Sequence, residues 1–341
     1  MNWNELLCCP RCHSALEANQ SGELRCISDE CALASSPFLS ASGQPVLIDF
    51  DASIFYPDAY LDGRGSSPPR DDTGRGFAST MRAIIWGGKN RIAPRIAEDL
   101  AARLKGRRPR AKLLVIGGGA VGAGVEKLYD GSIDVTGMDV YASPHTRFVG
   151  DAHAIPLRDE SVDAVWIQAV LEHVLEPAMV AEEIHRVLKP GGFIYADTPF
   201  LQQVHEGAFD FTRFTLSGHR WLFRDFEEIE TGAVGGAGTA LGQTIRYTFR
   251  ALGLGDKIAT TLTLPFFWLR FLDPLMTRRP NADAAAGVFF FGQKTGRGIG
   301  PKDMIDYYEA QTREPARLRL RSRRPVPMGA PMPVHPRVNE T

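Results

Sequence analysis

The stretch "LLVIGGGAVGAG", residues 113–124, places a run of apolar residues directly before a glycine-rich loop. The apolar run is typical of a buried β-strand. Gly117, Gly119 and Gly122 then form a G-x-G-x-x-G pattern, in which the backbone turns tightly, approaches a ligand closely and opens a helix with free N–H groups. The loop therefore predicts a bound cofactor, and it leaves open which one.

Helical and strand-like patterns alternate on both sides of this loop. A helix is predicted over residues 176–189, where Val180, Ile184, Val187 and Leu188 line one face and the turn at residues 190–191 ends it. A second helix is predicted over residues 90–106, and strands are predicted at 111–119, 132–140, 161–170, 191–199 and 287–294. Strands that alternate with helices predict an α/β fold with a Rossmann-like, doubly wound parallel sheet.

Composition excludes a general attraction to polyanions. The chain has 341 residues, with 39 Lys and Arg against 40 Asp and Glu, so the formal net charge is -1. Neither nucleic acid nor an anionic membrane is favoured by such a balance. The first residues, "MNWNELLCCPRC", lack the apolar run of a signal peptide, which predicts a cytoplasmic protein.

An acidic residue follows the strand after the glycine loop. Asp139 ends that strand in "VTGMDVY", where its carboxylate can accept hydrogen bonds from both hydroxyls of an adenosine ribose. Nicotinamide dinucleotides and S-adenosylmethionine both present that ribose. The first half of the sheet therefore does not distinguish between the two cofactors.

Residues 150–200 resemble the class I S-adenosylmethionine-dependent methyltransferases over their whole length. The resemblance rests on a set of motifs in order: Asp151-Ala152, Pro156-Leu157, "DESVD" at 159–163, Glu172-His173 and "RVLKPGG" at 186–192. It implies S-adenosylmethionine as the cofactor, with Asp151 on the exocyclic amine of adenine and the Ala152 backbone on a ring nitrogen. Gln168 would face the methionine part of the cofactor.

Two features depart from that family. Val115 stands two positions before the first loop glycine, where the family usually has an acidic residue, and the loop spacing is closer to a dinucleotide fingerprint. A non-catalytic scaffold that retains the fold and a nicotinamide-dependent oxidoreductase are therefore kept as alternatives.

The acceptor side is predicted in residues 198–223, after the fifth strand. This stretch resembles a subgroup of these methyltransferases linked with polysaccharide or lipid-linked sugar synthesis. His205 is the predicted general base, Asp210 orients it, and Arg213 holds the pair or an anionic substrate group. The alternatives are a structural Asp210–Arg213 ion pair with His205 capping a turn, and His173 as the base.

All the cysteines fall within the first 31 residues. Cys9 and Cys12 form one knuckle, Cys26 and Cys31 a second, and four thiolates complete a tetrahedral zinc site. Residues 6–50 resemble small zinc-ribbon proteins that partner tRNA and protein methyltransferases, through the cysteines and the "GQPVL" ending, which implies a docking or stabilising module. The alternatives are a ribbon without metal and a redox-sensitive thiol pair.

The predicted organisation has four parts. A zinc-ribbon-like module over residues 1–50 is joined by a linker, 51–88, to a methyltransferase domain over 89–298, and a basic, Pro-rich, disordered tail follows over 299–341. The domain carries an apolar insertion at about 239–283. Within it, residues 258–276 are interrupted by charges and prolines, which favours peripheral contact with a membrane over crossing it; a lid or a dimer surface is the alternative.

These patterns together predict methyl transfer from S-adenosylmethionine to an oxygen or nitrogen of a small-molecule or lipid-linked sugar acceptor. An RNA methyltransferase is a further alternative, which the arginine-rich tail would serve, although the tail lacks the interleaved aromatic residues of an RNA reader. The predicted protein is cytoplasmic with possible membrane association. No oligomeric state is predicted.

Overall fold

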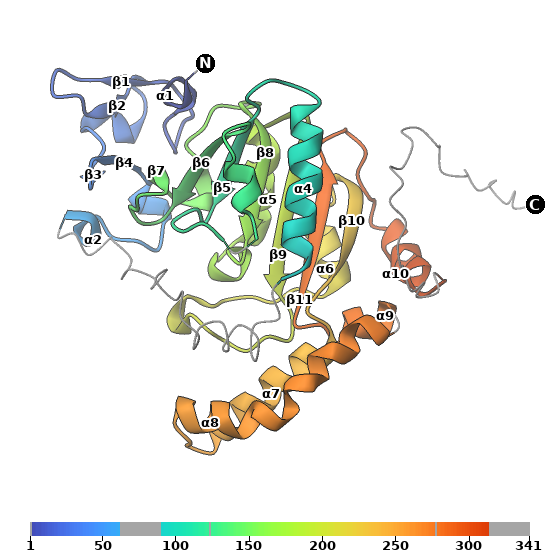
Figure 1. The fold of residues 1–341 in the computed structure, drawn as a ribbon. Coiled ribbons are helices and arrows are strands. Elements are labelled where there is room, and N and C mark those ends of the chain that lie inside the picture. Colours follow the sequence, from blue (N-terminus) through green and yellow to red (C-terminus); the bar gives the residue numbers. More distant parts are fainter. Residues whose placement is uncertain (1, 62–89, 123, 277, 314–341) are drawn as a thin grey trace, which may run out of the picture.

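The computed structural model describes residues 2–61, 90–122, 124–276 and 278–313. A nine-stranded sheet forms its centre, in the order β10-β11-β9-β8-β5-β6-β7-β4-β3 (Figure 1). Strands β4 to β9 pair in parallel, while β3, β10 and β11 run antiparallel to their neighbours at the two edges. The strands are β3 (Ser40–Ala41), β4 (Gln44–Leu47), β5 (Lys112–Ile116), β6 (Asp134–Asp139), β7 (Thr146–Gly150), β8 (Val162–Gln168), β9 (Leu188–Pro199), β10 (Glu227–Val234) and β11 (Gly287–Gln293). The predicted doubly wound α/β fold is confirmed.

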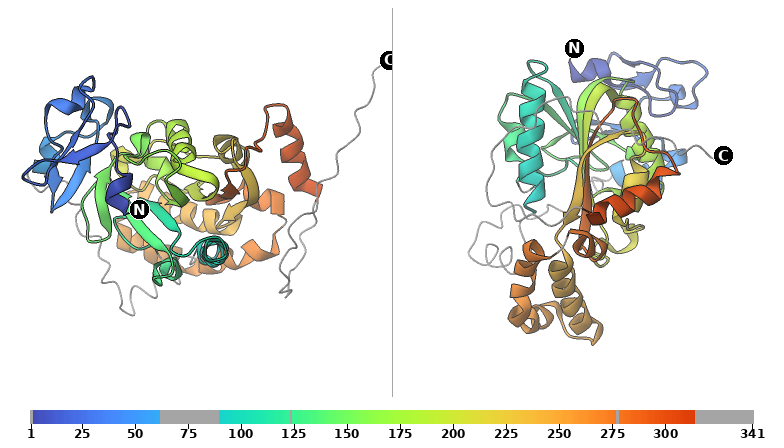
Figure 2. Two further views of the ribbon diagram at one scale, coloured as in Figure 1. Left: turned by 90° about the horizontal axis from the view of Figure 1, so that it is seen from above. Right: turned by 90° about the vertical axis from the view of Figure 1, so that its right-hand side faces the viewer.

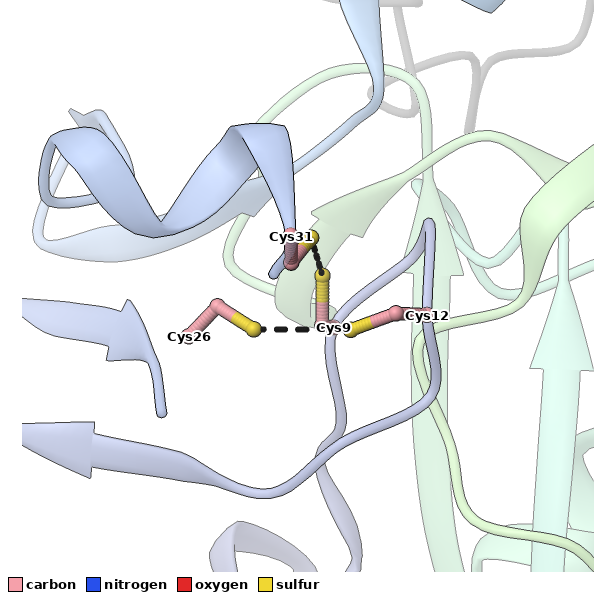
Figure 3. Close-up of side chains that lie close together, drawn as sticks. All are labelled: Cys9, Cys12, Cys26 and Cys31. Atoms are coloured by element: carbon pink, nitrogen blue, oxygen red, sulfur yellow. Dashed lines mark hydrogen bonds between the residues drawn. The ribbon is translucent and has the colours of Figure 1, made fainter. Parts of the chain in front are cut away.

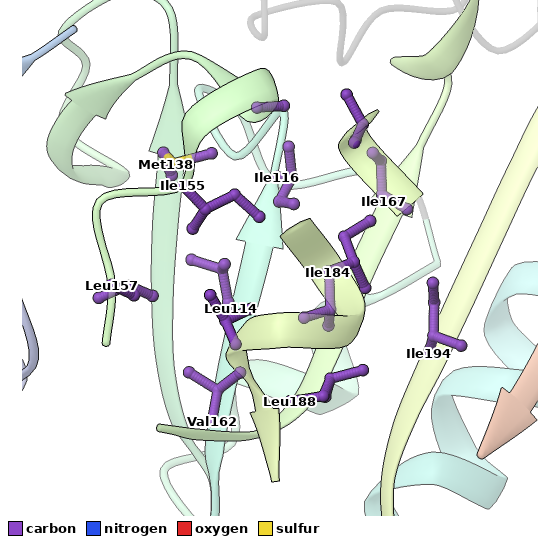
Figure 4. Close-up of a cluster of buried hydrophobic side chains, with 14 of the residues drawn as sticks. Leu114, Ile116, Met138, Ile155, Leu157, Val162, Ile167, Ile184, Leu188 and Ile194 are labelled. Atoms are coloured by element: carbon purple, nitrogen blue, oxygen red, sulfur yellow. The ribbon is translucent and has the colours of Figure 1, made fainter. Parts of the chain in front are cut away.

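Both faces of the sheet are buried, because successive residues of its strands point to opposite sides. Leu114 and Ile116 of β5 join one core, which α5 (Pro177–Val187) and α6 (Leu216–Leu222) cover. Figure 4 shows part of this core. Leu113 and Val115 join the core on the other face, which α4 (Ile92–Lys105) covers (Figure 2). Because both faces of the sheet are buried, its central strands are apolar at nearly every position.

The glycine loop differs from its prediction. Between β5 and β6 the described residues form turns and one short 3₁₀ helix, η3 (Glu126–Tyr129), so no α-helix opens after the loop. Five of the eight residues 117–124 are glycine, and each glycine disfavours a helix by about 1 kcal/mol relative to alanine. Helix α5 also ends earlier than predicted, at Val187, because β9 begins with the next residue.

The N-terminal region, predicted as a small module, adds two strands to one edge of the main sheet. Val46 and Leu47 of β4 pair in parallel with Val149 and Gly150 of β7, and Trp3 is buried in the main core. The region comprises α1 (Trp3–Leu6), a hairpin of β1 (Leu16–Ala18) and β2 (Leu24–Cys26), η1 (Ala32–Ser35), β3 and β4.

The predicted linker begins with ordered structure. η2 (Phe50–Ala52) and α2 (Asp58–Leu61) follow β4, and Tyr60 is buried. The remaining linker residues, 62–88, lie outside the described residues.

The predicted insertion lies between β10 and β11. It forms α7 (Ala237–Ala251), α8 (Asp256–Thr263), η7 (Leu264–Leu275) and α9 (Arg278–Asp283), which extend from one end of the sheet (Figure 1). Since Val234 pairs with Gly287 and Gly287 pairs with Pro199, that end is where the parallel strands finish.

The predicted disordered tail begins with a helix. Residues 303–313 form α10 (Asp303–Arg313), and Tyr307 anchors it by donating a hydrogen bond to Glu228 on β10 (2.8 Å). The prediction of disorder is therefore wrong for this part. The arginine-rich and Pro-rich residues 314–341 lie outside the described residues.

Candidate functional site

The candidate site lies at the carboxyl ends of the parallel strands. The chain order reverses between β5 and β8, since β6 and β7 follow on one side of β5 while β8 and β9 follow on the other. Loops at such a switch point leave a crevice in which α/β proteins bind ligands. The glycine loop follows β5, and Gln168 ends β8.

The glycine loop is held against the end of β6. The backbone N–H of Gly119 donates a hydrogen bond to Asp139 (2.8 Å), whose other carboxylate oxygen accepts from the N–H of Val140 (2.8 Å). Gly117 has a φ of +75°, and a Cβ placed there would lie 2.4 Å from Cγ2 of Val170. The sequence therefore needs glycine at this position both for the turn and for the close approach of the loop after β8.

Gln168 lies close to the glycine loop. A Cβ on Gly122 would be 3.5 Å from the side-chain oxygen of Gln168, which also accepts a hydrogen bond from the Trp166 indole (3.3 Å). Val115, which replaces the acidic residue of the resemblance, is buried in the apolar core on the α4 face.

A different carboxylate is buried near this point. Asp197 of β9 pairs with Gln168 across the sheet and accepts hydrogen bonds from Tyr195 (2.8 Å) and Asn90 (3.0 Å). Burial raises the pKa of Asp197 to about 6. Asn90 also accepts from the first N–H groups of α4, so it ties that helix to the carboxyl edge of the sheet. No sequence motif marks either residue.

Asp151 and Ala152 follow β7, as predicted, and Ala152 begins the short helix η4 (Ala152–Ala154). The Asp151 carboxylate accepts hydrogen bonds from Ser53 (2.6 Å) and from the His153 backbone (3.0 Å), and it contacts the His153 ring (2.5 Å). Burial acts to raise the pKa of Asp151. The hydrogen bonds lower this pKa by more than burial raises it, so the net shift is downward.

Residues from the predicted linker reach this side of the site. Ser53 contacts Asp151, and the Tyr60 hydroxyl donates to the carbonyl of Val140, directly after Asp139 (2.8 Å). Residues 53–60, from the end of η2 into α2, therefore contact the residues that the sequence assigns to the adenosine end. No sequence motif marks it, because the contacts join positions 80 and 98 residues apart.

The predicted acceptor residues are brought together after β9. Arg213 forms a two-pronged ion pair with Asp210, with one of the two contacts at 2.8 Å. Asp210 accepts a hydrogen bond from the His205 backbone (3.0 Å) and lies 3.3 Å from Nδ1 of its ring. The Arg213 guanidinium lowers the pKa of Asp210 to about 2, so this carboxylate is charged.

Glu172 and His173 lie next to this group, in η5 (Leu171–His173) after β8. The rings of His173 and His205 meet edge to face with their centres 5.0 Å apart. Burial raises the pKa of Glu172 to about 8, and the charges of Asp197 and Asp210 add to the shift. Burial also lowers the pKa of His173. The site thus contains a carboxyl group and an imidazole that are both driven toward their neutral forms.

The predicted cysteine ligands converge in the N-terminal region (Figure 3). The Sγ atoms of Cys9 and Cys31 lie 3.7 Å apart and those of Cys12 and Cys26 lie 3.5 Å apart, and all four Sγ atoms lie within 4.8 Å of one another. Burial raises the pKa of Cys9. Burial also acts to raise that of Cys12, but hydrogen bonds from Ser14 and neighbouring thiols hold it at about 6. Cys8 lies outside this group.

The centre of the chain is similar to a known protein domain family. Residues 114–196 match the methyltransferase domain family. This segment runs from β5 to β9 and contains Asp139, Asp151, Ala152 and Gln168.

Curated relatives match over parts of their length. A demethylmenaquinone methyltransferase from Renibacterium salmoninarum is 33% identical over 119 residues, which cover 32% of this chain and 48% of that protein. An uncharacterised 37.1 kDa protein in transposon TN4556 of Streptomyces fradiae is 43% identical over 51 residues, 15% of each chain. The chain therefore spans about half the length, or less, of the curated relatives it matches.

Solved structures with similar folds include a sarcosine dimethylglycine methyltransferase from Galdieria sulphuraria. It is 17% identical, covers 60% of this chain and 86% of its own, and has a TM-score of 0.39. The acceptor residues 205–213 and the cysteine cluster lie outside the matched methyltransferase domain.

Proposed function

We propose that the protein transfers a methyl group from S-adenosylmethionine to an oxygen or nitrogen of a small-molecule or lipid-linked sugar acceptor. The hydrogen bond between Gly119 and Asp139 carries this proposal, because it joins the glycine loop of the methyltransferase domain to the carboxylate at the end of the next strand. The cofactor supplies an electrophilic methyl group on a sulfonium ion. The chain has to bind the cofactor, align the acceptor and accept its proton.

The residues at the crevice fit such a cofactor. Gly117 has a positive φ of +75°, and a side chain there would collide with Val170. Asp139 would hold the ribose, Asp151 and the Ala152 backbone the adenine, and Gln168 would face the methionine part. Ser53 and Tyr60 support this arrangement from the N-terminal side, through Asp151 and the Val140 carbonyl.

The cofactor assignment is tested by calorimetric titration with S-adenosylhomocysteine, with NADH titrated in parallel. We expect micromolar binding of the adenosyl ligand alone, and loss of that binding in Asp139→Ala, because the ribose hydroxyls lose their acceptor and Gly119 loses its partner. Asp99→Ala, which removes an exposed carboxylate on α4, is the matched control and should bind normally. Binding of NADH in place of S-adenosylhomocysteine would overturn the assignment.

On the acceptor side, His205 is the proposed general base. Asp210 lies beside Nδ1 of its ring, which leaves Nε2 for the acceptor's proton. Arg213 fixes Asp210 and offers a positive charge to an anionic acceptor.

The cysteine cluster is proposed to bind a structural zinc ion. Zn–S bonds of about 2.3 Å in a tetrahedron separate the sulfur atoms by about 3.8 Å, close to the Cys9–Cys31 Sγ distance of 3.7 Å. A zinc with four thiolates has no open position for a substrate, so its role would be to hold the N-terminal region against β7.

The insertion is proposed to contact a membrane surface peripherally. No helix in the described ranges is long and apolar enough to span a bilayer. Four aromatic residues of η7 have side chains that are 39–50% exposed: Phe266, Phe267, Trp268 and Phe271. Helix α7 of the same insertion contacts the acceptor loop, since the Tyr247 hydroxyl donates to the Val204 carbonyl next to His205 (3.0 Å). A lipid-linked acceptor would thus lie near the proposed base.

Vesicle sedimentation tests this contact. Phe267→Ser with Trp268→Ser should weaken binding to anionic vesicles by at least about tenfold, because burying half-exposed aromatic side chains contributes more than about 1.4 kcal/mol. Leu175→Ser with Met179→Ser, an equally exposed apolar pair near α5, is the control and should leave binding unchanged. Failure of the unmodified protein to sediment with vesicles would refute the proposal.

A further inference from the structure

One buried carboxylate at the acceptor side accepts no hydrogen bond from the residues that the structure describes. The Glu172 side chain is 0% exposed, and neither of its oxygens accepts a hydrogen bond within the described part of the chain. A buried carboxylate without hydrogen bonds is costly, because it has lost the water that would solvate it. The site therefore needs a positively charged or proton-bearing partner at this point.

Two imidazoles are aimed at that carboxylate. Nε2 of His173 and Nε2 of His205 each lie 3.7 Å from Oε1 of Glu172. Each ring is fixed from behind: Nδ1 of His173 lies 2.6 Å from the carbonyl oxygen of Phe209, and Nδ1 of His205 lies 3.3 Å from Asp210. Because a carbonyl can only accept, the His173 Nδ1 carries the proton, and its Nε2 in the neutral ring presents a lone pair to Glu172.

We propose that Glu172, His173 and His205 form a binding site for a divalent transition-metal ion, with the two Nε2 atoms and the Glu172 carboxylate as ligands. Two imidazoles and one carboxylate form a ligand set that such ions use when other coordination positions stay open. Oxygen acceptors behind both rings provide the outer contacts that fix metal-binding histidines in the correct tautomer.

The dimensions agree with this assignment. Metal–ligand bonds of about 2.1 Å in a tetrahedron place the ligand atoms about 3.4 Å apart, a few tenths of an ångström below the 3.7 Å separations. The His173 and His205 side chains are 21% and 27% exposed, so an ion can enter from the acceptor side and keep an open position there. Arg213 neutralises Asp210, so the ligand set itself carries a single negative charge.

A proton on Glu172 is the competing explanation for its burial, and the raised pKa of Glu172 favours that proton until an ion displaces it. A proton on Glu172 could bridge the carboxylate to only one of the two imidazoles. A metal ion could bind all three ligand atoms, which come from two separate loops and lie within 4.8 Å of one another. A metal ion on Nε2 would take the lone pair that His205 needs as a base, so the proposed base role belongs to the chain without the ion. If the proposed function holds, the ion would take over that task in the loaded protein: an acceptor hydroxyl on the open position would have a lowered pKa and would lose its proton to solvent.

Metal content of the full-length protein tests the site. After zinc loading and exhaustive dialysis, zinc per chain would be measured by elemental analysis for the unmodified protein, Glu172→Gln and His205→Asn. Each variant should carry one equivalent of zinc less than the unmodified protein. Zinc bound by the cysteine cluster does not affect this comparison, because both proteins keep that cluster. The controls are Glu176→Gln, which follows four residues later on the surface, and His145→Gln in an exposed loop; both should match the unmodified protein.

Cobalt gives a second readout. Co²⁺ bound at this site should show absorption bands without thiolate charge transfer, and these bands should vanish in His205→Asn. Equal zinc content in the unmodified protein and in both folded site variants would overturn the proposal. Titration of the same samples with S-adenosylhomocysteine tests the proposed function independently. If the variants lose zinc but the unmodified protein does not bind S-adenosylhomocysteine, the metal site stands and the proposed methyltransferase function is wrong.

Discussion

Replacing Gly117 with alanine is expected to weaken the binding of S-adenosylhomocysteine by at least about a hundredfold, or about 2.8 kcal/mol. The residue has a φ of +75°, which costs a residue with a side chain about 1–2 kcal/mol. The added methyl would also lie 2.4 Å from Cγ2 of Val170, on the loop that follows β8. The glycine loop would have to move away from β8, and Gly119 would then lose its hydrogen bond to Asp139.

Gly131→Ala separates the backbone effect from the collision. Gly131 has a φ of +84°, but a Cβ there would meet no atom within 4 Å, and the residue lies at the far end of the connection between β5 and β6. This variant should lose a similar amount of stability from the backbone and keep its affinity. Calorimetry on both variants measures the difference. Equal losses of affinity would mean that the glycine loop does not shape the ligand site.

The fold was predictable because its signals are local. Apolar runs such as that of β5 arise because both faces of the sheet are covered, and helix α5 shows its buried face at every third or fourth residue. Asp139 and Gln168 lie at the ends of β6 and β8 for the same reason, since a strand pattern gives the position at which the strand stops. Asp151 was placed by the family resemblance, because no strand was predicted before it.

Contacts between distant segments were not predictable in this way. The pairing of β4 with β7 joins residues about one hundred positions apart, and nothing in "GQPVLIDF" indicates whether its strand extends another sheet. Ser53 and Tyr60 were assigned to a linker because their neighbourhood is rich in Gly, Pro and charge, although both contact the candidate site. The composition of a segment does not show which of its side chains are buried, and here the contacts of Ser53 and Tyr60 place the segment beside the candidate site.

The absence of a helix after the glycine loop has a related cause. The G-x-G-x-x-G pattern predicts that a helix follows, but it is silent on the intrinsic preference of the residues between the glycines. Here two additional glycines, Gly118 and Gly124, lower that preference, and only η3 forms. Likewise, the Glu172-His173 motif was visible, whereas its convergence with His205 depends on how the loop after β9 folds back.

Replacing Cys9 with alanine is expected to remove one equivalent of zinc and to loosen the N-terminal region. The small core there contains Cys9, Cys26, Cys31 and Ala34, so the proposed ligands make up most of its buried side chains. Structural zinc ions contribute about 10–16 kcal/mol to the folding of zinc-finger peptides, far more than one buried apolar side chain. Loss of the ion should release β4 from β7 and expose Trp3, which a shift in tryptophan fluorescence and faster proteolysis near residues 20–40 would report.

Cys8→Ala is the matched control, because Cys8 and Cys9 are neighbours and both are 0% exposed. Cys8 lies outside the cluster, and burial raises the pKa of its thiol to about 12, which keeps it protonated. Its replacement should cost about 1 kcal/mol of packing and leave the zinc content unchanged. If both variants retain zinc and melt at the same temperature, the cysteines pack as small apolar side chains and the proposed zinc site is wrong. If only Cys9→Ala loses the ion, the metal holds the N-terminal region on the sheet, and through Ser53 it supports Asp151 in the candidate site.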